Sequence, residues 1–130
     1  MNPFIQRRTL LRAALATAAT GGLSVQAQTA WPAKAVTLIV PFPAGGGTDA
    51  FARPMAAQFA RLTGKQLVID NRGGAGGTLG ASIAAKAPPD GYTLMLTTNG
   101  TQVINPALYK ATGFDPIKDF EPVAAVARDV

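Results

Sequence analysis

The sequence predicts an α/β fold built around a parallel sheet. Apolar runs rich in β-branched residues stand at residues 35–40 and 66–70, and each is followed by a glycine-rich loop and then by a helical pattern. A third apolar segment, residues 92–98, alternates around Leu94 and Leu96. Strands that alternate with helices through short loops form parallel sheets with right-handed crossovers and with helices packed on them.

The first unit begins with a strand at residues 35–40, whose unbroken apolar character is typical of a strand buried on both faces. Residues 42–47 form a loop, and a helix is expected at residues 48–63, with Gly64 as its C-terminal stop. Pro54 lies inside this helix and predicts a kink or a loose first turn. The side chains expected on its buried face are Phe51, Met55, Phe59 and Leu62.

The later elements follow from the same signals of periodicity and turn composition. We expect a strand at residues 66–70, a loop at 71–77, a helix at 78–86, a turn at 88–91, a strand at 92–98, a loop at 99–101, a short helix at 106–109, a turn at 115–119 and a strand at 120–127. The chain stops soon after this last strand begins, so we expect a truncated protein.

The first 27 residues have the layout of an export signal. Arg7 and Arg8 form a basic start, residues 10–19 are mainly apolar, and the small residues Val25 and Ala27 predict cleavage directly after Ala27. Arg7 and Arg8 also resemble a twin-arginine signal, and the twin-arginine and general secretory routes both stay open. The alternative is an amphipathic helix at the start of a cytoplasmic protein. Export would place the protein in the periplasm.

The composition excludes several chemistries. The chain has no cysteine and no histidine, so Cys/His zinc sites and nucleophile–histidine pairs are excluded. Neither Ser24 nor Ser82 stands in a G-x-S-x-G motif. The net charge of +5 could indicate nucleic-acid binding. We reject this interpretation because three arginines lie in the export segment and the other basic residues are scattered. We expect no catalytic residue, no metal, no cofactor and no nucleic-acid partner.

Three loops leave the carboxyl ends of the predicted strands, at residues 42–49, 71–78 and 98–101. In an open parallel sheet these ends meet at one edge, where ligands bind. Glycine allows a ligand to approach the backbone, and the start of a helix leaves N–H groups free to face an anion. Threonine and asparagine add neutral donors, so this edge suits a carboxylate even without a lysine.

The first loop also supports a rival hypothesis, a dinucleotide-binding domain of an oxidoreductase. GGGTDA at residues 45–50 fits G-x-G-x-x-G/A between a strand and a helix, and Asp70 ends the next strand near the position of a ribose-binding acid. The export signal argues against this hypothesis. So do residues 41–44, which lengthen the turn before the glycines.

Four blocks of sequence carry a resemblance to a known family. They are VPFPAGGGTD (residues 40–49) with Ala52 and Arg53, IDNRGGAGG (69–77), PDGYTL (89–94), and NPALY (105–109) with FEPV (120–123). In this order they resemble the Bug family, the TctC-like substrate-binding proteins of tripartite tricarboxylate transporters. The resemblance extends over nearly all of the chain after the export signal.

The resemblance implies a periplasmic binding protein type II-like fold with two lobes. Residues 28–130 would form the first lobe, a parallel sheet with flanking helices, and the second lobe would be missing. It also implies a small carboxylate ligand and transfer to membrane subunits of a tripartite tricarboxylate transporter. The implied ligand contacts are Phe42, Ala44, Gly45, Gly46, Thr48, Asp49, Gly77, Thr78, Thr98, Asn99 and Gly100.

Several of these residues have a structural alternative. Thr48 is also a candidate N-cap of the first helix. Asp49 could complement the helix dipole, hold the loop or meet an ammonium group. Phe42 could stack on a ligand or wedge the loop against the sheet.

Other residues near the loops are expected to have mainly structural roles. Arg53 is expected to be solvated or in an ion pair, and Arg72 is the better cationic candidate. Asp70 and Asn71 are expected to shape their turn through local side-chain to backbone bonds. The aromatic residues expected to pack against the domain are Trp31, Tyr92 and Tyr109.

Overall fold

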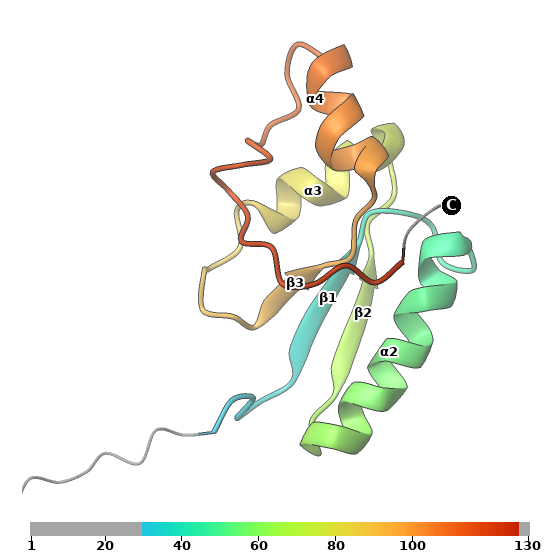
Figure 1. Cartoon of the computed structure of the whole chain (residues 1–130), viewed down its shortest axis with the longest axis vertical. Coiled ribbons are helices and arrows are strands. Elements are labelled where there is room, and N and C mark those ends of the chain that lie inside the picture. Colours follow the sequence, from blue (N-terminus) through green and yellow to red (C-terminus); the bar gives the residue numbers. More distant parts are fainter. Residues whose placement is uncertain (1–29, 128–130) are drawn as a thin grey trace, which may run out of the picture.

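The computed structural model describes residues 30–127, and these form a three-stranded parallel sheet with helices (Figure 1). β1 (Val36–Val40) lies in the centre, between β2 (Leu67–Asn71) and β3 (Thr93–Met95). Both neighbours run parallel to it, with Val36 opposite Leu67 and Thr37 opposite Thr93. The predicted α/β class is confirmed. The predicted export signal, residues 1–27, lies outside the described residues.

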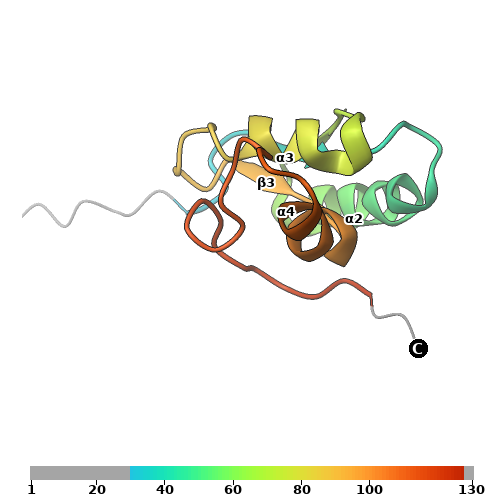
Figure 2. The ribbon, with the colours of Figure 1, turned by 90° about the horizontal axis from the view of Figure 1, so that it is seen from above.

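Helices cover both faces of the sheet. α2 (Gly47–Thr63) packs on β1 and β2, whereas α3 (Thr78–Ala84) packs on β1 and β3 from the opposite side (Figure 2). β1 is therefore buried on both faces, as its unbroken apolar sequence predicts. Among the described residues, no helix is long and apolar enough to cross a bilayer.

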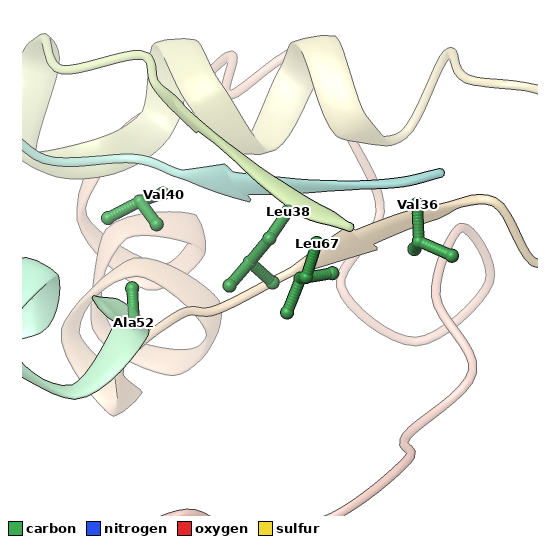
Figure 3. Close-up of a cluster of buried hydrophobic side chains, with 5 residues drawn as sticks. All are labelled: Val36, Leu38, Val40, Ala52 and Leu67. Atoms are coloured by element: carbon green, nitrogen blue, oxygen red, sulfur yellow. The ribbon is translucent and has the colours of Figure 1, made fainter. Parts of the chain in front are cut away.

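The main core lies between the sheet and α2. Figure 3 shows its side chains on the face of the sheet turned away from α3. The buried members are Val36, Leu38, Val40, Ala52 and Leu67. The three members from β1, Val36, Leu38 and Val40, share this face because every second side chain of a strand points to the same side.

The inward face of α2 differs from the predicted one. Ala52, Ala56 and Phe59 pack against the core, whereas Phe51 and Leu62 are 51% and 75% exposed. The small alanine side chains let the helix backbone approach the sheet. Of the four side chains predicted for this face, Phe59 packs on the core and Met55 is half-buried, whereas Phe51 and Leu62 point outward. Spacing identified the helix correctly, but it selected a stripe rotated from the one that is buried.

The ends of α2 confirm one prediction and correct another. Gly64 ends the helix in the left-handed conformation, with φ 68°, and its N–H bonds to the carbonyl of Ala60. Thr48 is not the N-cap, because Gly46 takes that position and Thr48 is the second residue of the helix. Pro54 lies inside a helix that continues on both sides of it.

The third strand is shorter than predicted, since β3 covers only three residues of the expected 92–98. The register places Thr97 opposite Pro41, directly after the end of β1. Proline has no N–H to donate to a ladder, so pairing ends there. The helix predicted at 78–86 is α3, which ends at Ala84.

The third loop lies earlier in the chain than predicted, between the end of β3 at Met95 and Gly100. Instead of a loop at 99–101, a π-helical turn, η2 (Gly100–Ile104), leads directly into α4 (Asn105–Leu108). Thr98 starts this turn, because its carbonyl accepts the N–H of Gln102 and its hydroxyl accepts the N–H of Thr101. The short helix predicted at 106–109 is confirmed as α4.

The predicted strand at 120–127 is wrong, because the structure has no strand in this segment. Residues 121–127 are exposed and pair with neither edge of the sheet. An apolar sequence alone does not make a strand when no neighbouring edge receives it. The turn at 115–119 is confirmed, and the Asp115 carboxylate accepts the N–H groups of Ile117 and Lys118.

Aromatic side chains gather at the amino end of the sheet. Trp31 lies edge-on to Phe59 at 6.0 Å and beside Tyr92 at 6.4 Å between ring centroids. The Tyr92 hydroxyl accepts the N–H of Ala33 at 3.0 Å, and Lys34 Nζ lies 4.4 Å from the Tyr92 ring centre. Trp31 and Tyr92 thus pack against the domain as predicted, although Trp31 remains 53% exposed, whereas Tyr109 is 54% exposed and takes no part in this cluster.

Candidate ligand-binding site

The loops that follow the three strands meet at one edge of the sheet. Asn71, the last residue of β2, lies opposite Val40, the last residue of β1, and its side-chain amide donates to the carbonyl of Phe42 at 3.1 Å. Gly73 faces Pro43 so closely that a β-carbon on Gly73 would stand 3.1 Å from the proline ring. The first and second loops are therefore in direct contact.

Asp49 organises the first loop. Its side chain is only 1% exposed, and Oδ2 accepts the N–H of Gly45 at 2.9 Å and Nε of Arg53 at 2.7 Å. Oδ1 accepts the side-chain amide of Asn71 at 3.2 Å. The Gly45 N–H, and after it the Arg53 guanidinium, hold the pKa of the Asp49 carboxyl below its ordinary value.

The second loop is a left-handed backbone turn. Residues 74–77 all have positive φ, including Ala75 at 47°, a conformation that is uncommon for a residue with a β-carbon. The N–H of Gly77 bonds back to the carbonyl of Gly74 at 2.9 Å and closes the turn directly before α3. The glycines of this loop are thus required by its backbone path.

Two side chains that follow the third strand, one in η2 and one in α4, bond to this left-handed turn of the second loop. The Asn105 amide donates to the carbonyl of Gly76 at 2.9 Å and to the hydroxyl of Thr78 at 3.1 Å. The Thr101 hydroxyl donates to the same Gly76 carbonyl at 3.1 Å. Thr101 and Asn105 are both buried, at 0% and 9% exposure. The second and third loops are therefore tied together by buried hydrogen bonds.

Phe42 lies where the first and second loops approach each other. The ring packs against the core cluster below it, and a β-carbon on Gly77 would stand 3.3 Å from its tip and would also clash with Thr101. The ring therefore wedges the first loop against the sheet, one of the two roles considered for it. Gly77 is needed both for its φ of 92° and for this close approach.

The predicted contact residues lie along this edge of the sheet and differ in their exposure to solvent. Ala44, Gly45, Thr98 and Asn99 are exposed; Phe42, Gly46, Thr48, Thr78 and Gly100 are half-buried; Asp49 and Gly77 are buried. All of them belong to the three loops or to the first residues of the helices that follow. The two buried residues support the loops from within.

Three supporting residues, Asn71, Thr101 and Asn105, have roles that were not predicted from the sequence. Asn71 was expected to act locally, but it bonds to residues 22 and 29 positions earlier in the chain. Thr101 and Asn105 were not singled out, and their partner Gly76 lies 25 and 29 positions away. Contacts of this range leave no periodic signal in one sequence. The hints in the sequence were the position of Asn71 after a strand, of Thr101 in the third predicted loop and of Asn105 in the NPALY block.

The charges near this edge are paired with each other. Arg53 bonds to Asp49, and Arg72, the predicted cationic candidate, bonds to Asp70 at the surface through Nε at 2.9 Å. What the loops offer a ligand is backbone amides and neutral hydroxyl and amide groups. In the described part of the chain, no cluster of acidic side chains could hold a metal ion.

Loops meet at the carboxyl ends of the parallel strands, and buried polar side chains tie these loops together. This arrangement is typical of an α/β ligand-binding lobe. Residues 51–130 match the family described as the tripartite tricarboxylate transporter family receptor, TctC. The chain belongs to this family, and the resemblance to Bug and TctC-like proteins is confirmed.

Curated relatives support the same family. The chain is 38% identical over 122 residues to the UPF0065 protein in the tcbD-tcbE intergenic region of Pseudomonas sp. strain P51, covering 94% of this chain and 36% of that protein. It is 38% identical over 111 residues to BugT of Bordetella pertussis, covering 83% of this chain and 34% of that protein. The chain thus spans about a third of the length of these relatives.

Solved structures show that the fold is part of a periplasmic binding protein fold. MatC from Rhodopseudomonas palustris with bound malate matches with a TM-score of 0.69 and 44% identity, over 74% of this chain and 33% of that one. The periplasmic binding protein BugD matches with a TM-score of 0.67 and 43% identity, over 71% and 30%. R. palustris Rpa4515 with adipate matches with 0.64 and 46%, over 66% and 29%. None of these names supports the dinucleotide-binding hypothesis.

Proposed function

We propose that this chain is the first lobe of an extracytoplasmic solute-binding protein that captures a small carboxylate and catalyses no reaction. The observation that carries the proposal is the meeting of three loops rich in Gly, Thr or Asn at the carboxyl ends of β1, β2 and β3, tied together by Asn71 and Asn105. Two structural relatives were solved with the dicarboxylates malate and adipate, which supports an organic acid as ligand.

The chemistry of the edge supports an anion. Backbone N–H groups at the first turn of α2 have no partner within the helix and carry a partial positive charge. The hydroxyls of Thr48 and Thr98 and the amide of Asn99 lie on the same loops as neutral donors. Ordered waters would bridge the distances that these groups cannot cover directly. The proposed contacts are the exposed and half-buried members of the set predicted from the sequence, whereas the buried Asp49 and Gly77 support the loops.

The biological setting is part of the proposal. Residues 1–27 would direct export to the periplasm and be removed, and residues 28–130 would form one jaw of a cleft whose second jaw belongs to another lobe. The family name supports delivery of the bound acid to membrane subunits of a tripartite tricarboxylate transporter.

The test is a titration of the isotope-labelled chain with malate and with adipate, followed by nuclear magnetic resonance. We expect the amide signals of the three loops to shift with saturation, while those of β1 and of residues 121–127 stay in place. Adipamide, which has the carbon chain of adipate without its charge, is the matched control and should cause no shift. A folded chain whose loop signals respond to no acid in a broad panel, or respond instead to NAD, would refute the proposal.

A further inference from the structure

We infer that Asp49 is a positioning residue, which fixes the first loop in its binding shape and does not itself touch the ligand. This inference rests on the proposed function, because it concerns the same loop. Its basis is that the carboxylate is 1% exposed and directed into its own loop, where three donors bond to it. A group this deeply covered cannot reach a ligand outside the loop.

The three donors come from three different elements. The Gly45 N–H belongs to the loop, Arg53 lies one turn further along α2, and Asn71 is the last residue of β2. Asn71 also donates to the carbonyl of Phe42, at the other end of the loop. One carboxylate thus ties the beginning of the loop, its middle and the adjacent strand to the first turn of the helix.

Charge compensation explains why an acid can stand here. A free carboxylate would repel an anionic ligand, and burial without partners would be costly. Arg53 places its guanidinium against Asp49 at 2.7 Å, so the pair adds no net charge to the loop. The bond of Asp49 to Gly45 also takes up an amide that was predicted to face the ligand.

The Gly45 backbone makes this support necessary. Its φ is 81°, and a β-carbon there would meet nothing within 4 Å, so packing does not hold the residue in place. The turn closes instead through hydrogen bonds, from Gly45 to Asp49 and from the Gly46 N–H to the carbonyl of Pro43 at 3.3 Å. Without the carboxylate, the exposed glycines of the loop regain conformational freedom.

The experiment compares the chain with its Asp49→Ala and Asp49→Asn variants. Malate affinity is measured by titration, and hydrogen exchange is measured at the Gly45 amide and at the amides of β1. We expect Asp49→Ala to weaken malate binding by about tenfold or more and to speed exchange at Gly45, with exchange in β1 unchanged. Asp49→Asn keeps an acceptor for Gly45 but loses the charge facing Arg53, so its malate affinity and its exchange rate at Gly45 should lie between those of the wild type and of Asp49→Ala.

The matched control is Asp70→Asn. Asp70 pairs with Arg72 as Asp49 pairs with Arg53, but at the surface and away from the Gly45 amide, so affinity and exchange should not change. If Asp49→Ala does not fold, Arg53→Gln replaces it, since Arg53 is 62% exposed and its loss leaves the core intact. That variant should speed exchange at Gly45 alone.

The outcomes separate this inference from the proposed function. Wild-type affinity for malate and a protected Gly45 amide in Asp49→Ala would overturn the positioning role and leave the proposed function standing. Faster exchange everywhere, in β1 as well as at Gly45, would reduce Asp49 to a general stabiliser and also overturn it. Local loosening at Gly45 in a protein that binds no acid at all would overturn the proposed function instead.

Discussion

Three buried polar side chains, Asp49, Thr101 and Asn105, support the loops at the edge of the sheet. Each of them bonds to backbone atoms of a loop, and Asp49 and Asn105 also bond to other side chains. Removing one partner from a buried hydrogen bond costs more than the bond contributes when intact, because the remaining group is left without water or partner. The loops should therefore be sensitive to these residues.

The first prediction concerns the pH dependence that Asp49 gives to stability. The Gly45 N–H and Arg53 lower the pKa of its carboxyl in the native state, so the ionised form stabilises the fold above the unfolded pKa of about 3.9. This contribution is lost as the pH falls through the lower native pKa. We expect the free energy of unfolding of the wild type to exceed that of Asp49→Asn near neutral pH, and the difference to shrink as the pH falls below the unfolded pKa of about 3.9.

Urea denaturation of both proteins across this pH range provides the measurement. Asp115, whose pKa is also lowered, chiefly by the Ile117 N–H, is present in both proteins and cancels from the difference. A difference that persists unchanged at the lowest pH would contradict the prediction.

The second prediction concerns Asn105. The Asn105→Ala variant loses its bonds to the Gly76 carbonyl and to the Thr78 hydroxyl, and we expect the free energy of unfolding to fall by about 1–3 kcal/mol. Asn99→Ala is the control for stability, because Asn99 is exposed on the third loop and surface changes of this kind stay within about 0.5 kcal/mol. Equal denaturation midpoints for the two variants would argue against the role of Asn105.

At the scale of elements, the fit of α3 against the sheet depends on Gly80. A β-carbon at this position would stand 2.7 Å from the carbonyl oxygen of Arg72 and 2.7 Å from Cβ of Pro41. The helix therefore lies directly on the end of β1 and on the start of the second loop. Any side chain here would push α3 away from the loop that it supports.

The third prediction follows from this contact. Gly80→Ala should lower the free energy of unfolding by about 1–3 kcal/mol through overpacking. Gly47→Ala is the matched control, since a β-carbon at Gly47 meets nothing within 4 Å and alanine favours a helix over glycine by up to about 1 kcal/mol. Thermal unfolding followed by circular dichroism distinguishes them. The prediction fails if the Gly80 variant melts at or above the wild-type temperature.

The elements that could be predicted from the sequence are those whose signal is local. The β-branched run that becomes β1 is buried on both faces, and Gly64 ends α2 as expected. Predictions were less successful where the outcome depended on a distant segment that packs against or pairs with the element. Pairing of the third strand ends where Pro41 stands opposite it, and residues 120–127 remain without a partner strand. Burial of alanines instead of Phe51 likewise depends on how closely α2 approaches the sheet.

The same distinction holds for the candidate site. The meeting of three loops rich in Gly, Thr or Asn at one edge could be predicted, because parallel strands place their carboxyl ends together. The hydrogen bonds that join the loops could not, because Asn71 and Asn105 act on residues 22 to 29 positions away. Asp49 could be recognised as structurally important, but its partners appear only in three dimensions.

The whole molecule has two unlike ends. Glycine loops occupy the carboxyl end of the sheet, whereas Trp31, Phe59 and Tyr92 close the amino end. The Tyr92 hydroxyl fixes the segment before β1 through the Ala33 N–H. The candidate ligand-binding loops thus lie at one end of the sheet, and the aromatic cluster packs at the other.

The fourth prediction tests this amino end. Tyr92→Phe keeps the ring contacts but loses the bond to Ala33, and we expect the free energy of unfolding to fall by about 0.5–1.5 kcal/mol. Trp31 is the single tryptophan, so its fluorescence reports on this end of the molecule. Tyr109→Phe, at an exposed side chain, is the control and should leave both the fluorescence and the midpoint unchanged. Identical behaviour of the two variants would show that the Tyr92 hydroxyl contributes nothing.

The central position of β1 has a consequence for how the protein is made. β1 precedes both of its neighbours in the chain, and its last partner is Met95. β2 can pair with β1 as soon as Asn71 has been synthesised, but the other edge of β1 has no partner strand until the ribosome has translated past Met95. Long-range pairing of this kind is slow and leaves the nascent chain open to aggregation, so we expect its synthesis to depend on chaperones that shield this strand.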